Sequence, residues 1–124
     1  MRWPALGTLL LLAAPASGAD ILASRPTFRT GQKQVFCSLS NVGSTAVTIS
    51  NPKVTAEIGP AFDLPFAVNN CASTLRPGKN CSWLAYIRTG GAHFCRVTVS
   101  SKSGVRGQME IATFEAALAM EEMR

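Results

Sequence analysis

One stretch of the chain decides its fold class: Gln34-Val35-Phe36-Cys37-Ser38-Leu39-Ser40. Val35, Cys37 and Leu39 occupy alternate positions, while Ser38 and Ser40 point to the other side. Successive side chains of a β-strand face opposite ways, so this alternation predicts a strand with one buried and one solvated face.

The same period of two recurs on both sides of this stretch. Further strands are predicted over residues 21–28, 46–50, 54–58, 81–88, 95–100 and 105–111, with glycine, proline and asparagine turns between them. Asn51-Pro52 is expected to end the strand at 46–50, and the last two strands are expected to form a hairpin around Lys102-Ser103-Gly104. About seven short strands at this spacing predict an all-β, immunoglobulin-like β-sandwich.

The first 19 residues predict a secretory signal peptide. A basic start precedes an apolar run from Ala5 to Ala14, and small residues follow, so cleavage is expected after Ala19 or after Gly18. A membrane-spanning helix needs about 20 apolar residues, and this run is roughly half that length. No second long apolar run follows. We therefore expect a protein that is periplasmic or secreted, with no transmembrane segment in the mature chain.

The remaining chain divides into residues 20–113, expected as the sandwich domain, and an acidic C-terminal tail at 114–124. Residues 116–123 are rich in alanine, leucine, methionine and glutamate, which predicts a short helical or frayed extension.

Charge is distributed unevenly along the chain, whose net value is +5. Residues 20–109 hold ten basic and three acidic side chains, whereas residues 110–124 hold four glutamates and one arginine. A basic exported domain suits anionic surfaces, such as phospholipid headgroups or acidic polysaccharide, rather than nucleic acid. Because the basic residues are spread along the sequence without a cluster, a solubilising charge surplus is the favoured interpretation.

The four cysteines, all in the mature part, indicate two disulfides in an oxidising compartment. Cys37 and Cys95 fall on the inward faces of their strands and could bridge two sheets beside Trp83, whereas Cys71 and Cys81 flank a proline-glycine turn. Four cysteines allow three connectivities, and we favour the one that joins Cys37 to Cys95 and Cys71 to Cys81. Metal binding is not expected, because the cysteines lack close ligand spacing and there is only one histidine.

Catalysis is not expected, and neither is a cofactor. The single histidine, His93, could form a Ser-His-Asp arrangement only with Asp20 or Asp63, and no Gly-x-Ser-x-Gly motif occurs. His93 follows Gly90-Gly91 and is interpreted as a loop-end residue.

A family resemblance is carried by one string: Cys71-x-x-x-Leu75-x-Pro77-Gly78-x-x-Cys81-x-Trp83-x-Ala85-x-Ile87. This string resembles the C-terminal half of bacterial exported Ig-like domains of the ASH and choice-of-anchor type, and residues 38–49 are similar to their first core strand and turn. Thr89 stands near a position where these domains usually have proline, and the Cys37 and Cys95 pair is outside their usual pattern. The resemblance covers residues 34–111 and implies a β-sandwich that serves as a binding module without a catalytic site.

The favoured hypothesis is a non-enzymatic Ig-like binding or structural module of the bacterial envelope or medium. Its partner, an unknown protein or envelope component, is expected to reach it through an edge strand. The alternatives are a pilin-like subunit whose N-terminal segment complements a neighbour, and a small secreted hydrolase or hydrolase inhibitor.

Overall fold

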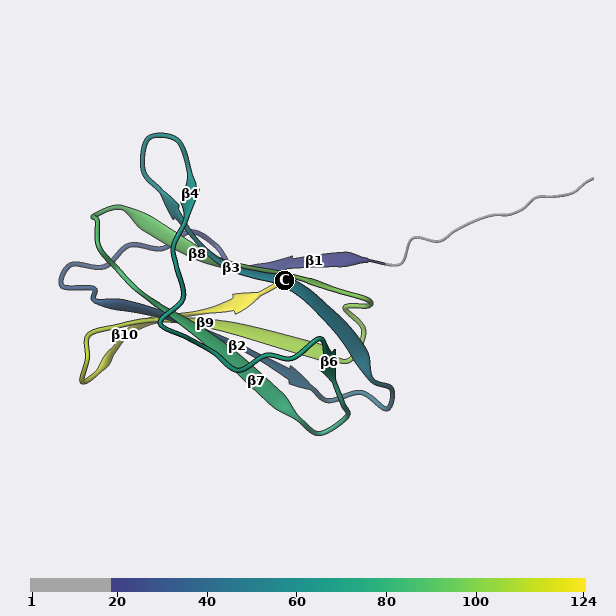
Figure 1. Ribbon diagram of the computed structural model, residues 1–124. Helices are drawn as coiled ribbons and strands as arrows, with labels where there is room; N and C mark the ends of the chain where they lie inside the picture. The colour runs from purple at the N-terminus through teal and green to yellow at the C-terminus, as the bar shows by residue number, and fades with distance from the viewer. Residues whose placement is uncertain (1–18) are drawn as a thin grey trace, which may run out of the picture.

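The computed structural model describes residues 19–124, which form an all-β sandwich of two antiparallel sheets (Figure 1). The predicted signal peptide lies outside the described residues, except for Ala19. Within the described part, no helix is long and apolar enough to cross a membrane.

Within residues 19–124, ten strands build the two sheets, and three of them have only two residues. They are β1 (Asp20–Ala23), β2 (Gln34–Asn41), β3 (Val47–Glu57), β4 (Phe62–Asp63), β5 (Val68–Asn69), β6 (Thr74–Leu75), β7 (Asn80–Tyr86), β8 (Ala92–Val99), β9 (Val105–Ala112) and β10 (Ala117–Met123). Sheet A has the order β1-β8-β3-β4, with β6 also on β3, and sheet B has the order β10-β9-β2-β7-β5.

The hydrophobic core lies between the sheets and follows the predicted alternation. Val35, Cys37 and Leu39 of β2 are completely buried, whereas the residues between them are partly exposed. Trp83 of β7 is also completely buried, and its indole N–H donates to the carbonyl of Lys53 at 3.2 Å. A disulfide between Cys37 and Cys95 crosses the core from sheet B to sheet A, with 6.0 Å between the two Cα atoms.

The expectation that Asn51-Pro52 ends a strand is wrong. β3 continues through both residues to Glu57, and its register with β8 shifts between Ser50 and Lys53. Asn51 takes the left-handed conformation, with φ at 52°, which asparagine tolerates better than most residues. The irregularity leaves Pro52 outside the register of β3 with β8. The N–H that proline lacks is therefore not needed for a hydrogen bond between these strands.

The predicted hairpin between the strands at 95–100 and 105–111 is also wrong. β8 pairs with β1 and β3 in sheet A, whereas β9 pairs with β2 and β10 in sheet B. The turn between them therefore crosses from one sheet to the other. It packs closely on the loop after β2, because a Cβ on Gly104 would lie 2.8 Å from the Cα of Gly43.

The C-terminal segment is not helical. β10 forms the true hairpin with β9, and Met123 is buried over Gly107, where an added Cβ would lie 2.8 Å from the Cβ of Met123. The backbone N–H and C=O of Arg124 then pair with Ala23 at 3.0 Å each. This burial and pairing outweigh the helical propensity of the segment, because tertiary contacts override a weak intrinsic preference.

Candidate functional site

The edges of the two sheets differ in how well they are covered. The outer side of β7 receives β5, together with hydrogen bonds from Ala67 and Asn70 at 2.8 and 2.9 Å. The outer side of β3 receives β4, β6 and a hydrogen bond from Leu64 at 2.8 Å. β1 has only four residues, and its Ala23 is paired with Arg124.

β10 is the long strand whose outer side has no partner among the described residues. Its seven residues pair with β9 on one side only. Because the backbone groups of Arg124 point away from β9 toward Ala23, the period of two makes those of Glu122 and Met120 point the same way. A row of unpaired N–H and C=O groups of this kind is a template for another strand.

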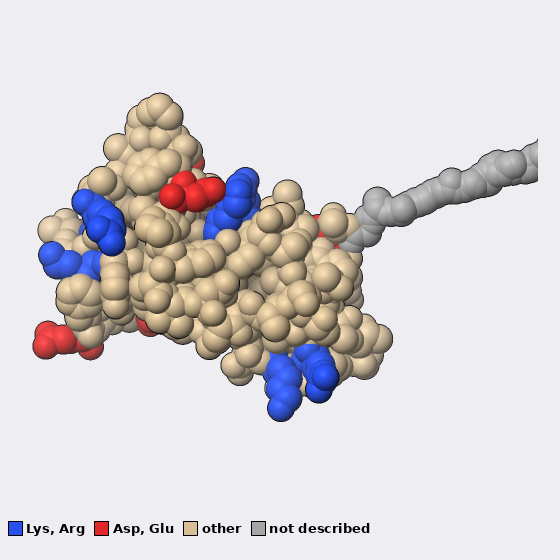
Figure 2. Space-filling model, in the orientation of Figure 1, with Lys and Arg blue, Asp and Glu red and all other residues tan. Residues whose placement is uncertain are grey.

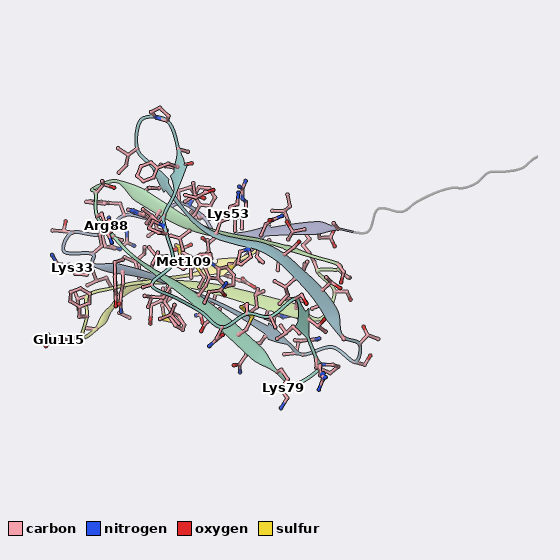
Figure 3. The ribbon with its side chains drawn as sticks, viewed as in Figure 1. Lys33, Lys53, Lys79, Arg88, Met109 and Glu115 are labelled. Carbon is pink, nitrogen blue, oxygen red and sulfur yellow. A yellow bond between two sulfur atoms is a disulfide. The ribbon has the colours of Figure 1, made fainter. Side chains whose placement is uncertain are left out.

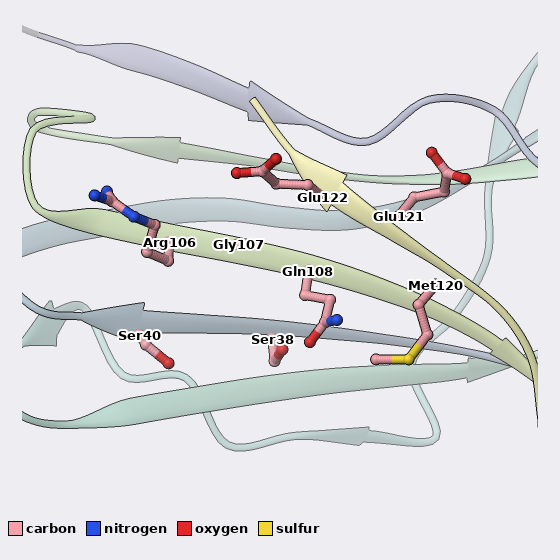
Figure 4. A pocket seen from close by; sticks show the side chains of 8 residues that line it. All are labelled: Ser38, Ser40, Arg106, Gly107, Gln108, Met120, Glu121 and Glu122. Atoms are coloured by element: carbon pink, nitrogen blue, oxygen red, sulfur yellow. The ribbon is translucent and has the colours of Figure 1, made fainter.

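A groove runs along β10 on the outer face of sheet B (Figure 4). Its volume is about 380 Å³, and its lining residues are Ser38, Ser40, Arg106, Gly107, Gln108, Met120, Glu121 and Glu122. A smaller hollow of about 80 Å³ shares Ser38, Gln108 and Met120 and extends the groove to Phe36. Another cavity, of about 250 Å³, is lined by Ala23, Arg25, Met120, Glu121, Glu122 and Arg124. The open edge of β10 therefore has hollows on two sides.

The chemistry of this region suits binding. Hydroxyl, amide, guanidinium and carboxylate groups line the groove, and the exposed thioether of Met120 supplies an apolar contact (Figure 4). The sequence analysis did not identify this site, because it treated residues 114–124 as a tail. The only sequence signal was the inward spacing of Ala119 and Met123, which is weak because alanine and methionine also favour helices.

His93 is in β8 and not at a loop end, so that interpretation is wrong. Its side chain is 0% exposed on the inward face of sheet A. Nδ1 donates to the carbonyl of Gly91 at 3.1 Å, whereas Nε2 is buried with no hydrogen-bond partner. Burial lowers the pKa of His93, and the bond to Gly91 only partly opposes this effect.

The two aspartates considered for a triad lie elsewhere. Asp63 accepts a hydrogen bond from Thr55 at 2.8 Å and pairs with Lys53 at 3.2 Å on the outer face of sheet A. Burial alone would raise the pKa of Asp63, but these two partners outweigh it and lower the pKa. Asp20 pairs with Val99 at the far end of β8, so the three groups are not brought together.

Within residues 19–124, no three His, Cys, Asp or Glu side chains gather as metal ligands would. All four cysteines are in disulfides, and the second joins Cys71 to Cys81 with 4.9 Å between their Cα atoms. It closes the turn that contains Gly78, whose φ of 78° is a positive value that glycine adopts readily. Both pairs are those favoured from the sequence.

We expect the buried His93 to make the stability of the domain depend on pH. Its folded-state pKa is lowered from the ordinary value of 6.5, so the unfolded chain binds the proton more readily. The free energy of unfolding should therefore fall as the pH drops through 6.5, by at most about 1.4 kcal/mol per pH unit. Chemical denaturation at pH 7.5, 6.5 and 5.5 measures this slope.

The variant His93→Leu should lose this slope, even where its stability at pH 7.5 is lower. Asp63 does not interfere, because its pKa is lowered from 3.8 and its contribution is lost only at more acid pH. A wild-type protein with equal stability at all three pH values would contradict the prediction.

No family model, curated protein or solved structure matches this chain. The resemblance to ASH and choice-of-anchor domains therefore stays a prediction.

Proposed function

We propose that this chain is an exported, non-enzymatic binding module of the bacterial cell envelope or medium, which holds an extended segment of a partner protein as an added strand on β10. The proposal rests on the outer side of β10, which is seven residues long and has no partner strand among the described residues. The other sheet edges are covered or short. Strand addition is a known mode of peptide recognition, in which backbone bonds supply affinity and side-chain hollows supply specificity.

Export is supported by the two disulfides together with the predicted signal peptide. Disulfides persist in oxidising compartments and are rare in the reducing cytosol. One of them joins the two sheets, and the other closes a surface turn, so both are built into the architecture of the domain.

The charge of the edge indicates which segment would fit. Glu121 and Glu122 lie at the open side of β10, and both line the hollows on either side of it. Acidic side chains on an edge discourage unselective pairing and self-association, because an identical strand would add like charges. A partner with lysine or arginine beside apolar residues would complement Glu122, Leu118 and Met120.

The pilin-like alternative is not favoured by any contact. The N-terminal strand that would be donated to a neighbour is β1, and it already pairs with β8 from Asp20 to Ala23. Donation would require this pairing to break.

Two substitutions at one position test the proposal. Met120→Pro removes an N–H that points away from β9 and places a ring at the open edge, so it blocks an added strand while leaving the β9 ladder intact. Met120→Ala removes the same side chain but keeps the N–H, and is the matched control. Thermal unfolding of both variants checks that each is folded.

The partner segment is first identified by photo-crosslinking from position 118 in envelope extract of the producing bacterium, and is then synthesised as a peptide. We expect Met120→Pro to weaken binding of this peptide at least about tenfold, whereas Met120→Ala changes it by a few-fold at most. Amide hydrogen exchange should slow at Met120 and Glu122 on binding. Equal affinity of the proline and alanine variants would refute strand addition.

A further inference from the structure

Folding gathers basic side chains that are scattered in the sequence. Arg29 and Lys33 come from the connection between β1 and β2, and Arg88 comes from the connection between β7 and β8. All three line one cavity of about 340 Å³ at an end of the sandwich. Figure 3 shows Lys33 and Arg88 side by side there, and Figure 2 shows basic side chains grouped at the same end. These three residues are therefore spread along the sequence but gathered in space.

No acidic partner neutralises this basic cavity within the described chain. The two ion pairs found in residues 19–124 are Lys53 with Asp63 and Arg124 with Glu122, and both lie outside the cavity. Its lining contains no aspartate or glutamate. Glu115 is at the same end of the molecule, on the turn between β9 and β10, but it does not line the cavity (Figure 3). Three cations converging without a counter-charge repel one another, and an anion would relieve that repulsion.

The two loops that carry the cations are fixed to each other before any ligand arrives. The side chain of Gln32 accepts a hydrogen bond from the N–H of Arg29 at 3.0 Å and donates to the carbonyl of Gly91 at 2.9 Å. The N–H of Ile87 donates to the carbonyl of Lys33 at 2.8 Å. Loops held in this way lose less conformational entropy when a ligand binds.

One aromatic ring lines the basic cavity, and a pair of rings includes Tyr86, which immediately precedes its lining residue Ile87. Phe28 is one of its lining residues and is 49% exposed. Phe114 is 69% exposed and packs edge-to-face on Tyr86, with 5.9 Å between the ring centroids. Tyr86 ends β7 immediately before the loop of Arg88. Exposed phenylalanine beside lysine and arginine is the composition of surfaces that lie on anionic membranes, since rings enter the interface while cations meet phosphate.

We propose that this end of the sandwich binds an anionic phospholipid surface, with a headgroup phosphate in the cavity of Arg29, Lys33 and Arg88 and with Phe28 and Phe114 entering the interface. The guanidinium and ammonium groups donate charge-assisted hydrogen bonds to the phosphate oxygens. This surface is separate from the edge of β10, so the chain can be held at a membrane while β10 stays open to a partner segment.

Co-sedimentation of the mature protein with vesicles tests the proposal. The vesicles contain phosphatidylcholine alone, or phosphatidylcholine with phosphatidylglycerol at about seven to three. The double variant Lys33→Gln/Arg88→Gln removes two cations of the cavity. Its matched control, Arg76→Gln/Lys79→Gln, removes the same charge from the turn before β7, at the opposite end of the molecule (Figure 3).

We expect binding to the anionic vesicles only, weakened at 500 mM relative to 50 mM sodium chloride. The cavity variant should bind about 25-fold more weakly, at about fivefold for each removed charge, and the control should bind nearly like wild type. Equal losses in both variants would overturn the proposal, because net charge alone would then explain the attraction. The proposal would also be overturned if amide chemical shifts showed that the protein binds inorganic phosphate but the protein did not bind vesicles. The Met120→Pro variant should bind vesicles normally. A failure of membrane binding can therefore be distinguished from a failure of strand addition.

Discussion

Removing the disulfide between Cys37 and Cys95 is expected to lower the free energy of unfolding by about 4 kcal/mol or more. The bond links residues 58 positions apart, and in the chain-entropy model a loop of that length contributes about 4 kcal/mol. Both cysteines are completely buried between the sheets, so Cys37→Ala/Cys95→Ala also leaves a void where the sulfur atoms were. Natural domains have about 5 to 15 kcal/mol of stability in total, so the variant should be close to unfolding at 37 °C.

The second disulfide provides the comparison. Cys71→Ala/Cys81→Ala opens a link of only 10 positions at the surface, for which the same model gives about 3 kcal/mol. Urea denaturation of the two double variants and the oxidised wild type measures both losses. A larger loss for the surface pair than for the core pair would contradict the view that the bridge between sheets dominates.

Asn41→Asp is the single substitution with the largest expected effect. Asn41 is 1% exposed at the end of β2, and its side-chain NH₂ donates to the carbonyls of Thr45 and Leu75 at 2.9 Å each. Aspartate has the same shape but would bury a carboxylate oxygen against these two acceptors. We expect a loss of about 3 to 5 kcal/mol at pH 7, because a charge is buried against two carbonyls that have lost their donor.

The pH dependence of this variant identifies the cause. The N–H of Gly43 donates to Asn41 Oδ1 at 3.0 Å and would still donate to the aspartate. Burial and the two facing carbonyls outweigh this one donor and raise the pKa of the new carboxyl group, so the folded state of Asn41→Asp binds a proton more readily than the unfolded state. Its stability relative to wild type should therefore recover as the pH falls toward 4. Asn70→Asp is the matched control: Asn70 is exposed, and its side-chain oxygen accepts from the N–H of Ser82, a role that aspartate keeps. Equal losses in the two variants would contradict the role assigned to Asn41.

Local sequence patterns predicted the strands better than their partners. The alternation in residues 34–40 correctly identifies β2 and its inward side chains, and the same argument buries Trp83. The alternation pattern does not indicate which strands are neighbours, because it distinguishes only the two faces of one strand. The mistaken hairpin of β8 with β9 is of this kind, because the turn between them is as short as a hairpin turn but connects different sheets.

The sequence by itself determined the fold class, because burial on alternate positions is a local pattern. It favoured one of three cysteine connectivities, and the structure has that one. The tertiary structure alone decided the features that bear on function. β10 is a strand because Met123 packs over Gly107 and Arg124 pairs with Ala23, contacts that no local propensity encodes. Lys33 and Arg88 meet because Ile87 donates to the carbonyl of Lys33 across 54 positions of sequence. The open edge and the basic cavity both arise from long-range pairing, which the order of residues alone does not display.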